Sequence, residues 1–296
     1  MRLSIWNSAP ALLLITGALL GLSLPFGKLS GAAGVQPVIW AFVISFGAGA
    51  VLLAALLVRG EARRPGAVTL RYFAIVAAIS YAFPNLLIMS AIPHLGAGFT
   101  GIMFTLSPVI TLLLSVLFRM KRPSALGVAG IAVGFAGALI VSLTRGEAGK
   151  PAEAIWIVIG LAIPFSLACG NIYRTLDWPK DAGPIELAAG SHLASAAMLV
   201  IISLALNGDV PLAPLAGVPL LTLAQAAAAA TMFAFFFRLQ AVGGPVYLSQ
   251  IGYVAAALGL VAGTVFLGER YQLATWVGAA IIMAGVAMTT QAQARR

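Results

Sequence analysis

Charged side chains are scarce in this chain. Only 8% of its 296 residues are Asp, Glu, Lys or Arg, whereas 61% are hydrophobic, and the mean hydropathy is +1.04. A protein that folds in water needs a polar surface around its core, and this composition is too apolar to supply one. The scarcity of charge therefore excludes a water-soluble globular protein and predicts a chain that folds in a lipid bilayer.

Cysteine and histidine are almost absent. The single cysteine, Cys169, cannot form an internal disulfide, and the two histidines, His94 and His192, lie far apart in the sequence. A membrane enzyme is expected to cluster His, Asp or Glu at one membrane face, and a receptor is expected to carry a signalling segment outside the membrane. The sequence shows neither, so we predict a protein that is not an enzyme and has no catalytic residues, metal or cofactor.

Acidic residues are missing from the middle of every long apolar stretch, and Glu186 and Glu269 lie at the ends of such stretches. A proton-coupled exporter of cationic drugs is expected to bury a carboxylate in the membrane. A carrier of phosphorylated sugars or nucleotides is expected to hold Arg or Lys in its cavity, whereas the basic residues here gather at the ends of the stretches. Both classes are therefore disfavoured.

Long apolar stretches are what the chain has in abundance. A membrane-spanning helix needs roughly 20 apolar residues, and the backbone groups of such a segment must be hydrogen-bonded within it. The predicted spans are 9–26, 35–58, 71–92, 98–118, 125–143, 154–173, 184–206, 216–238, 246–267 and 272–290. The connections between them are short. The sequence therefore predicts an all-α integral membrane protein with ten transmembrane helices and no separate soluble domain.

The two halves of the chain share a pattern of residues at an offset of 148 positions. The matching pairs are Phe118 and Phe266, Arg122 and Arg270, Gly130 and Gly278, and Gly137 and Gly285. Because five spans is an odd number, a second copy of the first half must start on the opposite side of the membrane. We therefore predict a 5+5 inverted-topology repeat of residues 1–148 and 149–296, with the substrate site between the halves.

The basic residues predict an orientation. If the N-terminus is cytoplasmic, 13 of the 17 Lys and Arg residues fall in the inside segments. Lys and Arg near span ends are retained on the cytoplasmic side, so we expect both termini in the cytoplasm. The net charge of +9 is then a topology signal and not a nucleic-acid-binding surface. The expected partners are the lipid bilayer and a small-molecule substrate.

Small residues at four-residue spacing recur in the fifth and tenth spans, as in Gly130 and Gly134 or Ala280 and Ala284. In lipid, such positions let two helix backbones approach closely. We expect them to pack helices within one chain, which leaves the protein a monomer. Dimerisation through the fifth and tenth helices is the alternative.

Neutral polar residues and neighbouring Met and Tyr residues within the spans are the candidate substrate contacts. Buried amides and hydroxyls are costly in a membrane unless they are paired or face a wet cavity. The predicted cavity residues are Tyr81, Asn85, Met89, Thr100, Met103, Ser107, His192, Gln250 and Tyr253. The first three follow i, i+4, i+8 and the next three i, i+3, i+7, so each set shares one helix face. For each residue, a structural hydrogen bond between helices is the alternative role.

Other residues within the spans predict bends and anchors. Pro84, Pro108 and Pro164 each remove a backbone donor and bend a helix, which makes them candidate hinges. Trp40 and Tyr173, near span ends, are predicted interface anchors. His192 is the only mid-span side chain that titrates near neutral pH, so a proton-sensing role is the alternative to a neutral, hydrogen-bonded imidazole.

The second half ends in a pattern that resembles a known family. The segment FLGER at 266–270, followed by WVG at 276–278 and AG at 284–285, is similar to the EamA-type branch of the drug/metabolite transporter superfamily. The first half departs from the pattern, with Lys121 where the family has an acidic residue. The resemblance implies a transporter of the bacterial inner membrane. More narrowly, it implies an exporter of aromatic and other neutral amino acids and related metabolites.

Alternating access around a central cavity is the expected mechanism. An amino acid is zwitterionic, so its transport requires no buried counter-ion, and aromatic side chains and Met would receive its apolar part. With no carboxylate in mid-membrane, facilitated diffusion along the substrate gradient is expected in place of proton antiport. The alternative function is a multidrug exporter of lipophilic cations, held by cation–π attraction and in some forms proton-coupled.

Overall fold

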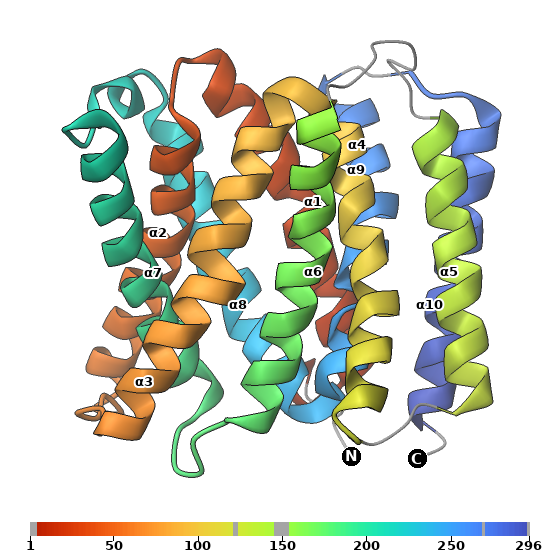
Figure 1. Cartoon of the computed structure of the whole chain (residues 1–296), viewed down its shortest axis with the longest axis horizontal. Coiled ribbons are helices and arrows are strands. Elements are labelled where there is room, and N and C mark those ends of the chain that lie inside the picture. Colours follow the sequence, from red (N-terminus) through yellow and green to blue (C-terminus); the bar gives the residue numbers. More distant parts are fainter. Residues whose placement is uncertain (1–4, 121–123, 145–153, 268–269, 295–296) are drawn as a thin grey trace.

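A computed structural model of the chain describes residues 5–120, 124–144, 154–267 and 270–294 (Figure 1). These residues form helices and short connections, and the described part contains no β-strand. The α-helices are α1 (Ala9–Ala32), α2 (Pro37–Val58), α3 (Ala67–Val76), α4 (Phe83–Leu117), α5 (Ala125–Thr144), α6 (Ala154–Leu176), α7 (Pro184–Asn207), α8 (Pro219–Leu248), α9 (Ile251–Leu267) and α10 (Leu273–Ala294). The prediction of an all-helical chain is confirmed for these residues.

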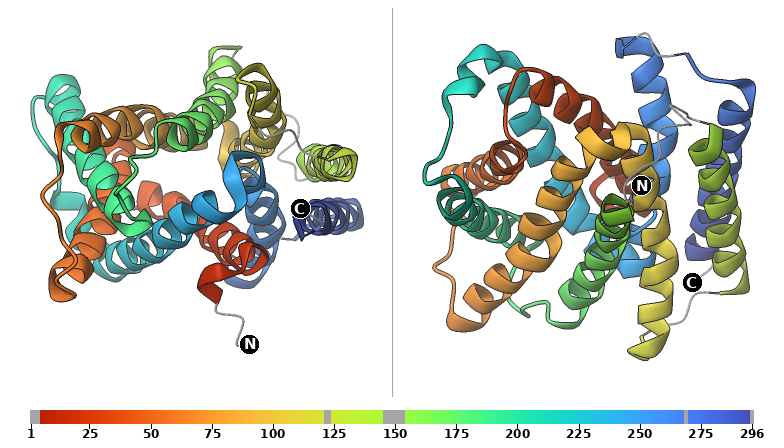
Figure 2. Two further views of the ribbon diagram at one scale, coloured as in Figure 1. Left: turned by 90° about the horizontal axis from the view of Figure 1, so that it is seen from below. Right: turned by 45° about the horizontal axis from the view of Figure 1, so that its top comes forward.

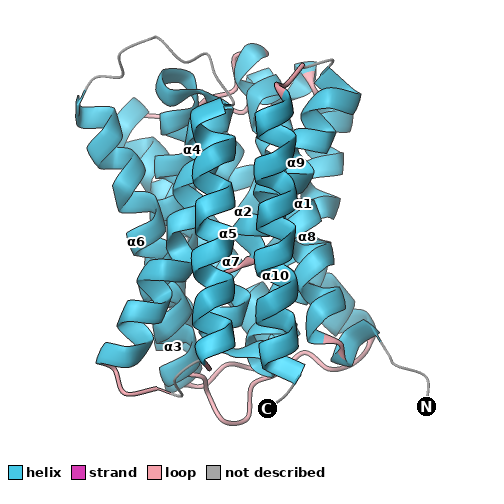
Figure 3. Ribbon diagram, turned by 90° about the vertical axis from the view of Figure 1, so that its right-hand side faces the viewer, coloured by secondary structure: helices cyan, strands magenta, loops and turns pink. Residues whose placement is uncertain are grey.

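Several helices are long and apolar enough to cross a membrane. Among the described residues, six segments meet that requirement, and Phe104–Leu117 and Ala125–Val141 are shorter apolar helices. The six are Ala9–Ala32, Pro37–Val58, Ala67–Ala91, Pro184–Asn207, Pro219–Leu248 and Leu273–Ala292. The helices lie side by side in one bundle, with the connections at its two ends (Figure 3). This arrangement is that of a multi-pass membrane protein.

Two helices contain a change of direction. The chain of α4 rises in orange and returns in yellow in Figure 1, and its apolar parts fall in the separate segments Ala67–Ala91 and Phe104–Leu117. In α8 the break lies at Gly244, whose backbone is non-helical (φ 74°, ψ 176°). A positive φ favours glycine, and the following Pro245 has no N–H to continue the helix. α4 therefore holds the predicted span 98–118 together with the end of span 71–92, whereas the predicted span 246–267 lies mainly in α9.

A short π-helix, Ala77–Ala82, links α3 to α4 directly before Pro84. A proline cannot donate a backbone hydrogen bond, and its ring crowds the preceding turn, so the helix widens there. The carbonyl of Ile79, five residues before Pro84, instead accepts a hydrogen bond from the hydroxyl of Ser166 in α6 (2.7 Å). The predicted bend at Pro84 therefore takes the form of a π-helical turn held by a neighbouring helix.

Small residues bring α5 and α10 together within the chain. The two helices stand side by side at one edge of the bundle, α5 in yellow-green and α10 in dark blue (Figure 2, left). A Cβ atom added to Gly137 would lie 2.6 Å from the backbone N of Ile282 and 2.7 Å from the carbonyl O of Gly278. The backbones are thus in contact, as the small residues predicted.

The other extensive contacts between helices join helices that are far apart in the sequence. α2 packs against α7, α4 against α6, and α1 against α9, and α8 contacts both α1 and α2. α1 begins and α10 ends at the same end of the bundle (Figure 3). We call this the terminal end.

The two predicted interface anchors differ in how deeply they are buried. Trp40 is buried within the protein core, with 1% of its surface exposed, because α2 is packed between α7 and α8. Tyr173 is half-buried, and its hydroxyl donates to Asp177 Oδ2 (2.5 Å), while Arg71 pairs with the other oxygen of the same carboxylate (2.9 Å). The prediction for Trp40 is wrong, because packing between helices removes it from lipid.

The contact between α5 and α10 can be tested by adding one methyl group. Gly137→Ala is expected to lower the free energy of unfolding by about 1–3 kcal/mol, because the new Cβ meets backbone atoms that cannot move aside. The matched control is Gly31→Ala in α1, where a Cβ meets nothing within 4 Å. Thermal unfolding in detergent measures both. A melting temperature that falls no further for Gly137→Ala than for the control would contradict the close packing.

Candidate functional site

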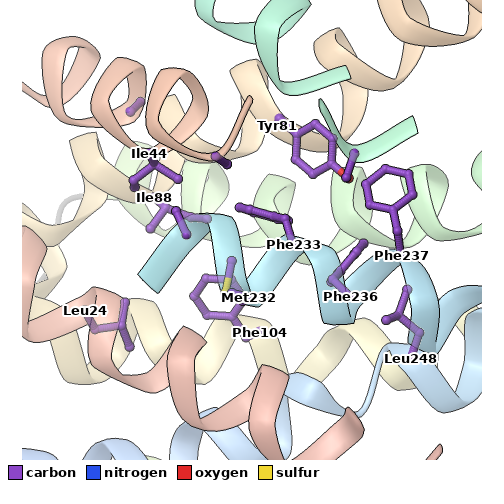
Figure 4. Close-up of a cluster of buried hydrophobic side chains, with 14 of the residues drawn as sticks. Leu24, Ile44, Tyr81, Ile88, Phe104, Met232, Phe233, Phe236, Phe237 and Leu248 are labelled. Atoms are coloured by element: carbon purple, nitrogen blue, oxygen red, sulfur yellow. The ribbon is translucent and has the colours of Figure 1, made fainter. Parts of the chain in front are cut away.

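A cavity lies in the middle of the bundle and is lined by helices from both halves of the chain. Its wall is mostly apolar, with residues from α1, α2, α4, α6, α8 and α9. The lining residues are Leu20, Ser23, Leu24, Ile44, Ser80, Tyr81, Asn85, Ile88, Met89, Phe104, Ser107, Leu167, Asn171, Arg174, Met232, Phe233, Phe236, Ser249, Ile251 and Gly252. Figure 4 shows a cluster of buried hydrophobic side chains that includes the lining residues Leu24, Phe104 and Phe233. We call this the central cavity.

Four of the predicted cavity residues line it. Tyr81, Asn85 and Met89 lie on one stripe that begins in the π-helix and continues into α4, and Ser107 joins them from the returning part of α4. The hydroxyl of Tyr81 and the side-chain nitrogen of Asn85 are buried with no hydrogen-bond partner. These groups are therefore available to a molecule in the cavity.

Three predicted residues lie outside the wall of the central cavity. His192 is fully buried behind it, with its ring 3.9 Å from that of Tyr81 and 3.8 Å from that of Phe233, centroid to centroid. Neither ring nitrogen has a hydrogen-bond partner, so ring stacking replaces the expected hydrogen bond. The hydroxyl of Tyr253 donates to the carbonyl of Ile131 (3.0 Å), which ties α9 to α5.

Gln250 lines a second cavity near the terminal end. Its side-chain oxygen accepts a hydrogen bond from Thr289 of α10. This second cavity is formed by the ends of α4, α6 and α10, the start of α5 and the break in α8. The segment 249–252 contributes residues to both cavities, so the two adjoin along the chain.

Some predicted residues cannot be placed. The side chains of Thr100 and Met103 lie outside the described part of the structure, as do Lys121 and Glu269. Of the predicted hinges, Pro84 follows the π-helix, Pro108 is buried in α4, and Pro164 lies inside α6. The sequence analysis did not single out the break at Gly244 and Pro245, although two consecutive glycines before a proline are a recognised signal for one.

Arg174 is the candidate site residue that sequence reasoning missed. The sixth span was predicted to end at residue 173, which placed Arg174 in a loop, whereas α6 continues to Leu176. The side chain lines the central cavity and has only 2% of its surface exposed. Arg174 lies in the last turn of α6, so it is at a helix end as expected. The inference that no basic side chain lines the cavity is wrong. Helical spacing could have found it, because Leu167, Asn171 and Arg174 follow i, i+4, i+7.

A hydrogen-bond network holds Arg174 between α6 and α8. Its Nε donates to Gln240 Oε1 (2.8 Å) and its Nη2 to Asn171 Oδ1 (2.6 Å). The amide nitrogen of Gln240 donates in turn to the carbonyl of Asn171 (2.8 Å) and to the hydroxyl of Thr175 (2.8 Å). Since Thr175 lines the second cavity, this network joins the walls of the two cavities.

Aromatic faces complete the surroundings of the guanidinium group. The Cζ atom of Arg174 lies 4.8 Å from the ring centroid of Phe236 and 5.8 Å from that of Tyr81. Phe236 contacts Phe233 edge to face (5.7 Å between centroids). Such contacts stabilise a cation weakly compared with a carboxylate. The central cavity is therefore apolar over most of its wall and positively charged at one place.

Comparison with known proteins agrees with the resemblance seen in the sequence. Residues 7–143 match the EamA-like transporter family. The chain is 29% identical over 289 residues to the "Uncharacterized inner membrane transporter YedA" of three Escherichia coli strains, K12, O6:H1 and O157:H7, covering 94% of this chain and 91% of each relative. A solved crystal structure shares the fold, with a TM-score of 0.74 and 22% identity over 98% of this chain and 100% of that chain.

The network around Arg174 predicts a specific loss of stability. Gln240→Leu is expected to lower the free energy of unfolding by about 1–3 kcal/mol, because it leaves Arg174 Nε without its partner in a buried place. Gln291→Leu, the same change at an exposed position of α10, is the control. Thermal unfolding in detergent compares them. Equal melting temperatures for the two variants would show that the network does not stabilise the fold.

Proposed function

We propose that this chain, a membrane transporter with an EamA-like domain, exports amino acids and related metabolites across the bacterial inner membrane. The aromatic and other neutral amino acids are the proposed substrates, and transport needs no covalent chemistry, metal or cofactor. The observation that carries the proposal is the central cavity, which both halves of the chain line with aromatic, Met and neutral polar side chains. Such a cavity suits an amphipathic small molecule.

The arrangement of the helices supports the inverted repeat. In such a repeat, each helix of the first half corresponds to the helix five places later, so α4 corresponds to α9 and α1 to α6. The contact of α4 with α6 is then the counterpart of the contact of α9 with α1, and both are present. α2 with α7 and α5 with α10 each pair a helix with its own counterpart. α1 runs away from the terminal end, whereas α6 runs towards it (Figure 1). A cavity between two halves of opposite direction is typical of alternating-access transporters.

The basic residues support a cytoplasmic terminal end. Arg59, Arg71, Arg119, Arg174 and Lys180 all belong to helix ends or connections at the terminal end, whereas Lys28 and Arg270 belong to the opposite end. Lys and Arg are retained on the cytoplasmic side of short connections. The relatives named as inner membrane transporters agree with this membrane. We therefore place the second cavity, which is at the terminal end, on the cytoplasmic side.

Movement between the two access states requires bends in helices that line the central cavity. The π-helix before Pro84, the proline inside α6 and the break at Gly244 all lie in such helices. The network of Arg174, Gln240, Asn171 and Thr175 lies between the two cavities. We propose that the halves rock about these bends, and that this network separates and re-forms as the cytoplasmic path opens and closes.

Arg174 weighs against the alternative function. A lipophilic cation in the central cavity would meet the aromatic faces of Phe233 and Phe236, but it would also lie beside a buried positive charge in a medium of low polarity. Among the described residues, no Asp or Glu lines the cavity to offset that repulsion. The same lack of a carboxylate supports facilitated diffusion along the substrate gradient over obligatory proton antiport.

The proposed function predicts gradient-driven flux in reconstituted vesicles. Proteoliposomes that contain the purified protein are expected to exchange radiolabelled phenylalanine faster than protein-free liposomes, and an imposed pH gradient should leave the final internal concentration unchanged. Uptake against the substrate gradient that depends strictly on the pH gradient would contradict facilitated diffusion. No flux of any amino acid would contradict the proposed substrate class.

A pair of substitutions in α1 ties that flux to the central cavity. Leu24→Trp places an indole where Leu24 lines the cavity, and we expect the uptake rate to fall by about tenfold because the substrate's space is filled. Leu14→Trp makes the same change at a position of α1 that is 42% exposed and should keep wild-type uptake. Equal rates for the two variants would show that the path lies elsewhere.

A further inference from the structure

We propose that Arg174, Ser80 and Asn85 form a binding site for the carboxylate group of the substrate, and that a single carboxylate is the feature every substrate shares. This inference rests on the proposed function for the direction and class of transport. The site itself follows from the charge, the hydrogen-bond donors and the shape of the central cavity.

The guanidinium group of Arg174 carries a positive charge that no side chain of the described structure neutralises. Its two hydrogen bonds go to the neutral amide oxygens of Gln240 and Asn171, and the ion pair found among the described residues is Arg71 with Asp177. A buried charge without a counter-ion costs free energy in a membrane. An anion that enters the cavity would remove that cost, so the substrate is the natural counter-ion.

Hydrogen-bond donors without partners line the same cavity as this charge. The hydroxyls of Ser80 and Tyr81 and the side-chain nitrogen of Asn85 line the central cavity, and each is buried with no partner. Amide N–H groups donate, and hydroxyls donate readily when an anionic acceptor is near. A carboxylate offers two oxygens with about four acceptor positions, so one such group satisfies the guanidinium and neighbouring donors together.

Gly170 provides the space at which these groups meet. A Cβ atom at this position in α6 would collide with the hydroxyl oxygen of Ser80 and would lie 3.1 Å from Arg174 Nη1. Ser80 is presented there by the π-helix, which Pro84 and the Ser166 hydrogen bond to Ile79 define. The local backbone thus brings the hydroxyl and the guanidinium to one point, between α6 and the helix opposite it.

The single positive charge in the central cavity favours an anion with a single negative charge. One guanidinium group balances one negative charge, and no second Lys or Arg lines the cavity among the described residues. A phosphate monoester carries about −1.5 to −2 charge near neutral pH, so it would remain under-neutralised here. A monocarboxylate matches the site, and the apolar wall formed by Leu24, Met232 and Phe233 receives the rest of the molecule.

Binding of four related compounds tests the inference independently of transport. The ligands are phenylalanine, 3-phenylpropionate, phenylalaninamide and phenethylamine, which share a phenyl group and differ in their carboxylate and amino groups. Thermal stabilisation of the purified protein in detergent reports binding. We expect 3-phenylpropionate and phenylalanine to stabilise the protein and the two compounds without a carboxylate to have little effect. Stabilisation by none of the four, or equal stabilisation by phenethylamine, would overturn the carboxylate site.

Substitutions assign the site to its residues. Ser80→Ala is expected to weaken phenylalanine binding by about tenfold, because it removes a donor to an anion, and it should not harm folding since this hydroxyl has no partner. Ser191→Ala is the matched control, because Ser191 is equally buried and unpartnered but does not line the cavity. Unchanged binding in Ser80→Ala, or an equal loss in both variants, would contradict the assignment.

Arg174 is tested by a graded pair. Arg174→Gln should abolish the preference for 3-phenylpropionate over phenethylamine, and Arg174→Lys should retain it with weaker binding, because Lys keeps the charge but not the planar donor pair. If Arg174→Gln fails to fold, Ser80→Ala and the ligand comparison still decide the question. Carboxylate-dependent binding without amino acid flux would contradict the proposed function alone, whereas amino acid flux without carboxylate preference would contradict this inference alone.

Discussion

The cost of an unpaired charge or polar group inside a membrane is the constraint on which this structure depends. Arg174 is buried at the wall of the central cavity, and its place is kept by neutral partners from α6 and α8. These partners satisfy the hydrogen bonds of the guanidinium but not its charge. We therefore expect the cavity to bind an anion. Arg174 both joins α6 to α8 and faces the proposed substrate path.

The packing around the cavity separates rigid parts from parts that bend. α5 and α10 lie at one edge of the bundle, with backbones in contact through glycine, and neither contributes to the wall of the central cavity. The helices that do line it contain the π-helix, the proline inside α6 and the break at Gly244. Close packing of small residues thus supports one edge, while proline and glycine leave the cavity helices able to bend.

Sequence reasoning predicted the helices better than the site. Composition and span length were enough for an all-helical membrane protein, because lipid leaves the backbone few alternatives. Tyr81, Asn85 and Met89 were placed correctly relative to one another, because helical spacing fixes a stripe. His192 and Tyr253 were predicted to line the cavity but pack against neighbouring helices, since periodicity does not show whether a polar residue faces a cavity or a neighbouring helix. Arg174 was missed because the boundary of one helix was set three residues too early.

The central claim is that the cavity opens to each side of the membrane in turn. Met232→Cys, in a Cys169→Ser background, places one thiol on the cavity wall, and a membrane-impermeant thiol reagent can be added to either side of oriented vesicles. The account predicts labelling from both sides, slowed by phenylalanine in each case. Labelling from one side only, or labelling that phenylalanine never slows, would contradict alternating access through this cavity.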